Sequence, residues 1–263
     1  MDLKNARILL TGASGGLGQE LARQLNDAGA ALLLAGRDQG RLAALSTSLG
    51  TGVASVCADL GRPAGVVALA GAAREFGINV LINNAGVGAF GLFENQDWPT
   101  IEGVLATNLE APVRLTHALL PWLKAQPQAA IVNIGSTFGS LPFPGFVAYS
   151  AAKAGLRGFS QALRRELADS LVSVVHIAPR AIDTPLNSYA VKALNRALKN
   201  HSDSAEDVAR QIVRALRRGD GESHFGFPER LFAWINGFAP ALIDRGLAGK
   251  LAIIKQHSSS SSS

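Results

Sequence analysis

The stretch that decides the fold is Thr11-Gly12-Ala13-Ser14-Gly15-Gly16-Leu17-Gly18. The apolar run Ala6–Leu10 before it predicts a β-strand, and the segment Gly16–Ala28 after it predicts a helix. A glycine-rich turn between strand and helix lets the backbone approach a pyrophosphate closely, and the first helical turn offers free N–H groups. Because the glycines follow T-G-x-x-x-G-x-G rather than G-x-G-x-x-G, the turn taken alone indicates either a phosphate-binding loop or a simple tight turn.

Downstream of this loop, short apolar runs alternate with segments of helical length. Uninterrupted apolar strands joined by helices favour parallel pairing, so we predict an α/β fold with a doubly wound parallel sheet and helices on both faces. One domain, residues 1–227, is expected, followed by a C-terminal amphipathic extension (228–257) and a low-complexity serine tail (258–263). Pro112 is expected to break or kink its helix. The predicted strands are Ala31–Ala35, Gly52–Cys57, Val80–Asn83, Ala130–Gly135, Val172–Ala178 and Ser223–Phe227, and the predicted helices are Asp38–Leu49, Pro63–Phe76, Trp98–Leu120, Val147–Leu171 and Ser204–Arg217.

Composition and charge narrow the class of protein. Of 263 residues, 48% are hydrophobic and 17% charged, which excludes global disorder. The single cysteine, Cys57, excludes an internal disulfide and a multi-cysteine metal site, and no metal is expected. The net charge of +5 is scattered and not interleaved with stacking aromatics, so nucleic acid is not an expected partner. Neither a signal peptide nor an apolar run of about 18 residues is recognisable, which predicts a cytoplasmic protein.

The end of the second predicted strand bears on the choice of cofactor. An acidic residue there would bind the ribose hydroxyls of NAD, whereas an arginine accommodates the 2′-phosphate of NADP. Gly36 occupies the expected acidic position and Arg37 follows, while Asp38 is better placed to cap the next helix. The charges therefore favour NADP(H) over NAD(H), unless Arg37 is an ordinary solvated loop residue.

Tyr149 and Lys153 indicate acid–base chemistry. Residues four apart share a helix face, and a nearby ammonium favours phenolate, so Lys153 is expected to lower the pKa of Tyr149. A tyrosine with a lowered pKa is a usable acid near neutral pH. The alternative is a surface pair, because Y-x-x-x-K occurs often by chance. Ser136 and Asn83-Asn84-Ala85-Gly86 end two strands, so they would converge with the glycine-rich loop at one edge of the sheet.

Taken together, these motifs resemble the single-domain branch of the short-chain dehydrogenase/reductase family. T-G-x-x-x-G-x-G, N-N-A-G, Asn108, Ser136 and Y-x-x-x-K stand in the family's order and spacing, and the resemblance extends from about Lys4 to Phe227. It implies a seven-stranded doubly wound sheet. It also implies hydride transfer between a nicotinamide cofactor and a carbonyl/alcohol pair, and assembly as a homodimer or homotetramer.

The resemblance also implies roles for matching residues. Tyr149 would be the general acid, Lys153 would lower its pKa and hold the nicotinamide ribose, and Ser136 would bind the substrate oxygen. Asn108 would kink its helix and hold a water. Asp59 matches a contact to the adenine, although it could instead cap the helix before Pro63. The cofactor-binding positions are Gly12, Ser14, Gly16, Leu17, Gly18, Arg37, Asp59, Leu60, Asn84, Ala85, Gly86, Tyr149, Lys153, Pro179, Ile182 and Thr184.

Arg180 departs from the family pattern. The family usually has Pro-Gly after this strand, whereas this chain has Pro179-Arg180. Because glycine allows backbone conformations that arginine resists, the loop near the nicotinamide could be shaped differently. We favour a solvated arginine; the alternative is a contact with an anionic part of the cofactor or substrate.

Aromatic residues gather in the segments that border the substrate cleft of this fold. Phe90 follows the N-N-A-G turn, and Phe138, Phe143 and Phe146 stand between Ser136 and Tyr149, in a chain that is only 6% aromatic. This local enrichment leads to the hypothesis of an apolar ketone or aldehyde as substrate. Packing of the same phenylalanines in the core or a dimer face is an equal alternative.

Two further segments, a predicted lid and the C-terminal extension, carry predictions of their own. Pro185–His201 predicts a mobile, helix-rich lid with Lys192, Arg196 and Lys199 on one face. The extension 228–257 has an apolar stripe with interspersed basic residues, which suggests peripheral membrane contact. We favour packing on the same or a partner subunit. The alternative functions are a non-enzymatic NADP(H)-binding sensor and a membrane-docked regulatory protein on the same fold.

Overall fold

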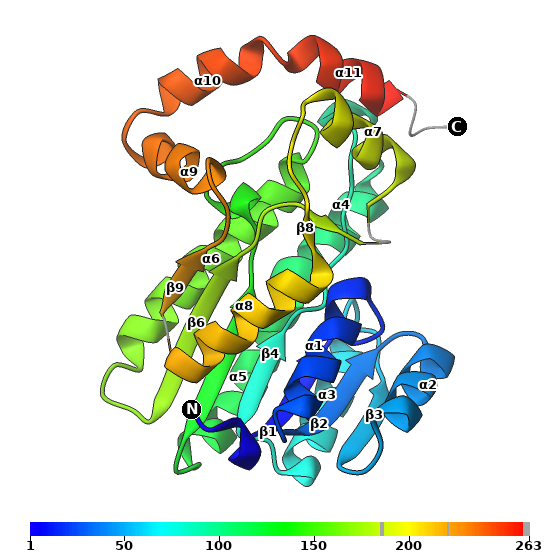
Figure 1. The fold of residues 1–263 in the computed structure, drawn as a ribbon, viewed down its shortest axis with the longest axis vertical. Coiled ribbons are helices and arrows are strands. Elements are labelled where there is room, and N and C mark those ends of the chain that lie inside the picture. The colour runs from blue at the N-terminus through cyan, green and yellow to red at the C-terminus, as the bar shows by residue number, and fades with distance from the viewer. Residues whose placement is uncertain (185–186, 220, 260–263) are drawn as a thin grey trace.

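Seven parallel strands form the central sheet, in the order β3-β2-β1-β4-β5-β6-β9 (Figure 1). The computed structural model describes residues 1–184, 187–219 and 221–259. The chain winds outward from β1 to β3, crosses back, and winds outward again from β4, so the predicted doubly wound sheet is confirmed. The strands are β1 (Arg7–Thr11), β2 (Ala31–Gly36), β3 (Val53–Cys57), β4 (Val80–Asn83), β5 (Ala129–Ile134), β6 (Val172–Ala178) and β9 (Glu222–His224).

Helices cover both faces of the sheet. Along β1, Ile8 and Leu10 belong to one apolar core and Leu9 belongs to the other. Alternate residues of a strand point to opposite faces, so this central strand is buried on both sides. The first layer consists of α1 (Gly16–Asp27), α2 (Gln39–Leu49) and α8 (Ala205–Arg218), and the second consists of α3 (Pro63–Phe76), α5 (Ala111–Lys124) and α6 (Val147–Glu166).

Two predicted elements differ from the structure. β3 is largely exposed rather than buried on both faces, because it forms the edge of the sheet beside β2. The helix α6 ends at Glu166, five residues before the predicted end. Ser170 stabilises the turn that follows, because its hydroxyl donates to Leu167 O at 2.8 Å and accepts from Val172 N at 3.3 Å. A side chain that bonds to nearby backbone competes in this way with helical bonds.

The helix expected over 98–120 is interrupted, as predicted, but one turn before Pro112. It divides into α4 (Trp98–Leu105), a π-helix (Ala106–Glu110) and α5. Pro112 has no N–H to donate to the carbonyl four residues earlier, that of Asn108. The Asn108 side chain lies in the π-helix and donates to Val104 O at 2.9 Å and to Val87 O at 2.8 Å. The helix is therefore irregular at Asn108, as a π-helix, at the residue where we expected a kink.

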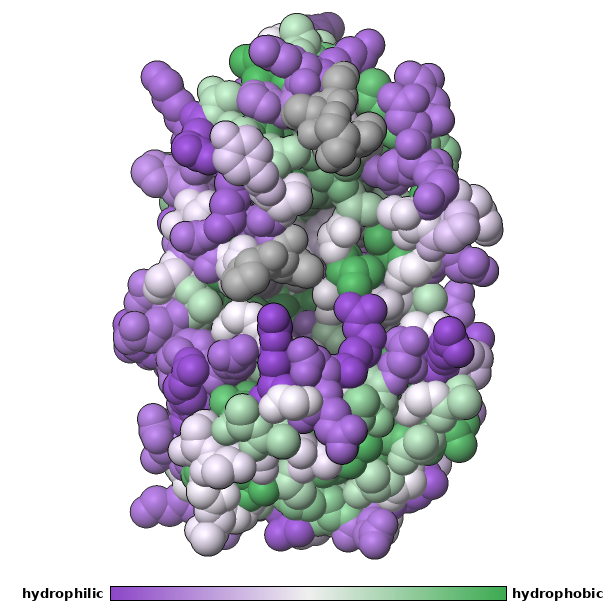
Figure 2. Space-filling model, turned by 90° about the vertical axis from the view of Figure 1, so that its right-hand side faces the viewer, coloured by the Kyte–Doolittle hydropathy of each residue, from purple (hydrophilic) through white to green (hydrophobic). Residues whose placement is uncertain are grey.

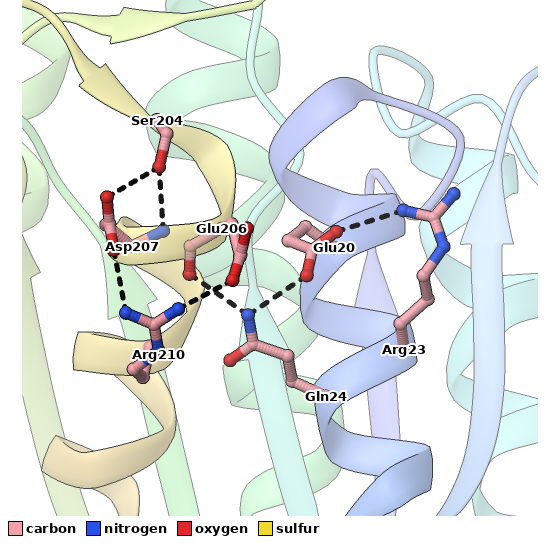
Figure 3. Close-up of polar contacts among 7 residues, drawn as sticks. All are labelled: Glu20, Arg23, Gln24, Ser204, Glu206, Asp207 and Arg210. Carbon is pink, nitrogen blue, oxygen red and sulfur yellow. Dashed lines mark hydrogen bonds and ion pairs between the residues drawn. The ribbon is translucent and has the colours of Figure 1, made fainter.

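The first turn of α8 is hydrogen-bonded to the middle of α1. Ser204 caps α8 by accepting from Asp207 N at 3.1 Å. Gln24 Nε2 donates to Glu206 O and to Glu20 Oε1, both at 3.0 Å, so it bridges the two helices (Figure 3). These contacts fix α8 beside the helix that follows the glycine-rich loop.

The predicted lid segment contains one short helix, which is too short to carry all three predicted basic residues. Its helix α7 covers Tyr189–Ala197, and residues 185–186 lie outside the described residues. Lys199 follows the helix with φ of +54°, so the prediction that Lys192, Arg196 and Lys199 share one helix face is wrong. A small parallel sheet, β7 (Ile182–Asp183) with β8 (Asp203–Ser204), closes the segment at its base.

Three helices form a C-terminal arm, α9 (Glu229–Phe238), α10 (Pro240–Ala248) and α11 (Leu251–Ser259). The arm rises from β9, arches away from the sheet and brings α11 beside α7 (Figure 1). In α9 and α10, both fully described, no residue is buried. Short 3-10 helices complete the chain at Leu3–Asn5, Phe93–Asn95 and Thr137–Gly139.

Within 1–184, 187–219 and 221–259, no helix combines the length and the apolar character needed to cross a membrane.

Candidate active site

The glycine-rich loop is locked against the end of β4. Gly12 has φ of +66°, and a Cβ there would lie 2.7 Å from Ala85 Cα. The Thr11 hydroxyl accepts from Asn84 N at 2.9 Å and from Ala85 N at 3.0 Å. A Cβ on Gly18 would collide with Gly12 O and lie 2.8 Å from Ala13 Cα. These glycines are therefore required by the backbone packing of the loop itself.

The start of α1 fits an anionic group. Gly15 stands at its N-cap, and within the described chain no side chain bonds to the cap. The first-turn N–H groups of α1 therefore face the carboxyl edge of the sheet, where strand order reverses between β1 and β4. This edge is where a dinucleotide binds in folds of this kind, so the loop has the geometry of a pyrophosphate site.

Gly86 keeps the adjoining space open. A Cβ on this residue would lie 2.8 Å from Asn108 Oδ1 and 3.9 Å from Lys153 Nζ. The absent side chain leaves room beside two polar groups. Asn108 and Lys153 are the polar side chains there that could hold a nicotinamide ribose.

The end of β2 lies beside the loop. A Cβ on Gly36 would be 2.9 Å from Ser14 Oγ, so a larger residue there would crowd the loop. Arg37 is exposed, and Asp38 caps α2 by accepting from Arg41 N at 2.9 Å. The predicted capping role of Asp38 is confirmed.

Asp59 follows β3 and turns the chain before α3. Its Oδ1 accepts from Gly61 N at 3.0 Å, and its Oδ2 lies 3.6 Å from Arg62 Nε. The N-cap of α3 is Arg62, so the alternative that Asp59 caps this helix is wrong. The structure places Asp59 and Leu60 directly after β3, near the end of β2, because Ala58 N donates to Gly36 O at 2.8 Å.

The four residues expected to carry the chemistry meet at the ends of β4 and β5. Ser136 follows β5 and forms a hydrogen bond with Tyr149 on α6. Lys153, one turn further along α6, donates from Nζ to Ile134 O at 2.8 Å. Its Nζ lies 5.7 Å from the centre of the Tyr149 ring. Asn108 approaches this group from the π-helix, across the space left open by Gly86.

Burial controls the titration of this group. It raises the pKa of Tyr149 above its ordinary value, and the hydrogen bond with Ser136 opposes this with a smaller effect. Burial also lowers the pKa of Lys153 to about 8. The expectation that Lys153 lowers the pKa of Tyr149 is therefore wrong in this structure. Removal from water disfavours both charged forms, and the ammonium bonds to Ile134 O instead of the phenol.

The four predicted pocket phenylalanines cluster on Tyr149. Phe138 stacks on Phe143 with ring centres 5.3 Å apart, and Phe146 lies 5.1 Å from Phe138 and 5.0 Å from Phe90. The Tyr149 ring meets Phe138 and Phe146 edge-on, each at 6.4 Å. All four rings are partly buried. Figure 2 shows a hollow at mid-height of the molecule, with apolar surface inside it and hydrophilic side chains along its lower rim.

Arg180 is neither solvated nor available to an external anion. Its Nε and Nη2 donate to both carboxylate oxygens of Asp203, at 2.8 and 2.6 Å. Its Nη1 lies 3.6 Å from Glu229 Oε2. The favoured interpretation of a solvated arginine is wrong, because protein carboxylates surround the guanidinium. Sequence reasoning missed both partners, which stand far along the chain in segments without a recognisable motif.

His176 is a second residue that the sequence did not single out. It is fully buried at the end of β6, and among the described residues neither ring nitrogen has a hydrogen-bond partner. Burial lowers its pKa to about 4. No group of three or more His, Cys, Asp or Glu in the described part of the chain is arranged to hold a metal.

Comparison with known proteins identifies the family. The family model for short chain dehydrogenases matches residues 6–195. The chain is 32% identical over 231 residues to the uncharacterized oxidoreductase DltE of Bacillus subtilis, covering 84% of this chain and 88% of that protein. It is 34% identical over 269 residues to dehydrogenase/reductase SDR family member 7B of Bos taurus, covering 94% and 82%.

Solved structures agree with this result. A short-chain dehydrogenase from Sphingobium yanoikuyae in complex with NADPH matches with a TM-score of 0.80 and 31% identity, covering 91% of this chain and 95% of that chain. Another from Burkholderia phymatum, in complex with NAD, matches with a TM-score of 0.83 and 26% identity, covering 92% and 96%. The fold and the site define an oxidoreductase with a nicotinamide cofactor. The chain belongs to the short-chain dehydrogenase/reductase family.

Proposed function

We propose that the protein reduces apolar ketones or aldehydes with NADPH. The observation that carries this proposal is the position of Tyr149, hydrogen-bonded to Ser136 and enclosed by phenylalanine rings at the carboxyl edge of the sheet. Polar groups that act on a carbonyl oxygen thus stand beside an apolar surface that fits the rest of such a substrate. When bound, NADPH supplies the hydride.

The protein's own residues supply the proton and the orientation. A raised pKa keeps Tyr149 protonated near neutral pH, so its hydroxyl can donate to the carbonyl oxygen. The Ser136 hydroxyl positions the same oxygen. Lys153 Nζ, held by Ile134 O, would bind the nicotinamide ribose, and its pKa of about 8 suits proton exchange near neutral pH. Asn108 would hold a water in the proton relay.

NADP(H) is preferred to NAD(H) in this proposal. Arg37 is exposed beside the loop, where its guanidinium can pair with a 2′-phosphate. Ser14 Oγ crowds the position of Gly36, which disfavours the acidic residue that NAD requires there. The related structures include complexes of both kinds, so the preference rests on these residues.

A panel of carbonyl compounds and alcohols, followed by NADPH absorbance, tests the proposal. Apolar ketones and aldehydes should give the highest kcat/KM, and NADH should be the poorer donor. Tyr149→Phe should lower kcat by about 100-fold to 10,000-fold while NADPH binding, followed by fluorescence, is retained. Best turnover on small polar sugars or hydroxy acids would contradict the substrate class. A variant that loses no function would favour a non-enzymatic sensor.

The exposed aromatics of the arm favour a second role, peripheral contact with a membrane. Trp234 and Phe238 on α9 are 64% and 75% exposed, and Arg245 and Lys250 stand further along the arm. Exposed aromatic residues with basic residues further along the same segment suit an anionic lipid interface. Flotation with phosphatidylserine vesicles tests this: Trp234→Glu should abolish binding. The control is Trp98→Glu, because Trp98 is also 64% exposed but stands on α4.

We also propose that the protein assembles as a homodimer or homotetramer. The family resemblance supports this state, and the exposed face of the arm offers apolar surface for a second copy. Light scattering gives the mass directly, and a monomer at micromolar concentration would contradict the proposal.

A further inference from the structure

The C-terminal arm begins at a partly buried ion cluster built around Arg180. The Arg180 side chain is only 18% exposed, as is that of Asp203, with which it forms a two-pronged pair. Glu229, in the first turn of α9, completes the cluster. Such paired geometry fixes a guanidinium in both position and orientation. We call Arg180, Asp203 and Glu229 the clasp.

The chain leading into the arm is shaped around this arginine. Gly226 has φ of +94°, and a Cβ there would lie 2.6 Å from Arg180 Cδ. Phe227 O accepts from Arg180 Nη1 at 3.4 Å. The glycine therefore makes room for the side chain that replaces the family's own glycine at position 180. Arg180 and Gly226 are therefore complementary in space.

The clasp joins three segments that are far apart in the sequence. Arg180 lies in the loop after β6, and Pro179 O in the same loop accepts from Thr137 N at 2.9 Å, directly after Ser136. Asp203 begins β8, at the end of the lid segment, and its N–H bonds to Ala181 O at 2.9 Å. Glu229 begins the arm. One guanidinium thus fastens the loop, the lid base and the arm together.

Beyond the clasp, the arm contacts the segments that carry the aromatic cluster at two points. In α9, Asn236 Nδ2 donates to Ser140 O at 3.0 Å, in the segment that carries Phe138. In α11, Ile254 is fully buried. A Cβ on Gly145 would lie 3.5 Å from Ile254 Cγ2 and 2.7 Å from Phe90 Cε2, so Ile254 and Phe90 meet at this glycine.

We propose that Arg180 is a positioning residue, and that the clasp holds the arm so that the buried Ile254 supports Phe90, which forms part of the binding surface for bulky apolar substrates. The part of this inference that concerns the substrate rests on the proposed function. The attachment of the arm by the clasp is independent of that function. Removal of one carboxylate leaves a partly buried arginine underpaired, so the arm should separate from the body more often.

The attachment is tested by limited trypsin digestion of the full-length protein, without any substrate. Cleavage at Arg245 and Lys250, followed by mass spectrometry, should be about tenfold faster in Glu229→Gln and in Arg180→Gly than in the wild type. Arg180→Lys keeps the charge but not the fork geometry, and should recover part of the protection.

Glu206→Gln is the matched control. Glu206 also stands in the first turn of a helix and also pairs with an arginine, Arg210, at 2.6 Å (Figure 3). This variant should leave the cleavage rate in the arm unchanged. Equal rates in the wild type and Glu229→Gln, or equal acceleration in the two glutamine variants, would overturn the clasp.

The role in substrate binding is tested by comparing benzophenone with acetone. In Arg180→Gly the KM for benzophenone should rise about tenfold, while the KM for acetone and the Kd for NADPH stay unchanged. Parallel changes for both ketones would indicate a general structural effect and overturn the positioning role. If the wild type reduces neither ketone, the proposed function fails, and the cleavage rates alone decide on the clasp.

Discussion

The phosphate-binding end and the substrate end of the candidate site are stabilised by different physical interactions. At the phosphate end, Gly12 and Gly18 are fixed by backbone contacts that leave no room for a Cβ. At the substrate end, Arg180 is fixed by carboxylates from two other segments. A position without room for a Cβ accepts only glycine, whereas an ion cluster can be formed by several combinations of charged residues. The phosphate end should therefore tolerate few substitutions, whereas the ion cluster at the substrate end could be built from other residue types.

The largest effect should come from Gly18→Ala at the phosphate end. Its Cβ would collide with Gly12 O, so the loop must deform, and we expect a loss of about 4 kcal/mol in the free energy of unfolding. Urea denaturation measures this. Gly71→Ala in α3 is the control, because no described atom outside its own neighbourhood lies within 4 Å of that Cβ. If Gly18→Ala lowered the free energy of unfolding by less than about 1 kcal/mol, steric exclusion would not be what fixes the structure of the glycine-rich loop.

An intermediate effect should come from His176, below the substrate end. Its folded pKa of about 4 lies below the ordinary 6.5, chiefly because of burial, so the unfolded state binds the proton first as pH falls. Stability is fully present above pH 6.5 and declines towards pH 4, by about 3 kcal/mol.

The test of this second prediction is His176→Leu, compared with the wild type by thermal and urea unfolding across the same pH range. Leucine removes a buried ring whose nitrogens have no partner among the described residues, so the variant should lose less stability on acidification. A wild type and variant with parallel pH profiles would show that another group governs acid unfolding.

The smallest effect should come from helix caps, which occur at both ends. Asp38→Ala removes the cap of α2 and Ser204→Ala removes that of α8, and each should cost about 1 kcal/mol in thermal unfolding. Asp38→Asn keeps an oxygen acceptor and should cost only a few tenths of a kcal/mol. Unequal losses of stability in Asp38→Ala and Ser204→Ala would show that the strength of helix capping also differs between the phosphate end and the substrate end.

Most of the sheet could be predicted from sequence because its signals are local. Pro63–Phe76, Val80–Asn83 and Val172–Ala178 have the predicted bounds, since apolar runs and a proline in the first helical turn mark them. The two-residue strands β7 and β8 carry no such pattern, and their pairing depends on contacts made across the lid.

In the candidate site, too, features with a local sequence signal could be predicted, and features that depend on distant segments could not. The spacing of Tyr149 and Lys153 predicted that they lie on one helix, and the structure agrees. It could not predict the direction of the Tyr149 pKa shift, because burial depends on residues from other segments. Arg180 was recognised as unusual, but Asp203 and Glu229 carry no signal that points to it.

The side chain of Asn108 has a consequence for the free energy of cofactor binding. Its amide accepts from Val87 N at 3.3 Å and donates to Val87 O, so it satisfies both backbone groups of the chain that leaves β4. That stretch is ordered by the protein alone, before any encounter. Little conformational entropy is then lost on association, and the site behaves as a preorganised receptor rather than one that folds around its guest.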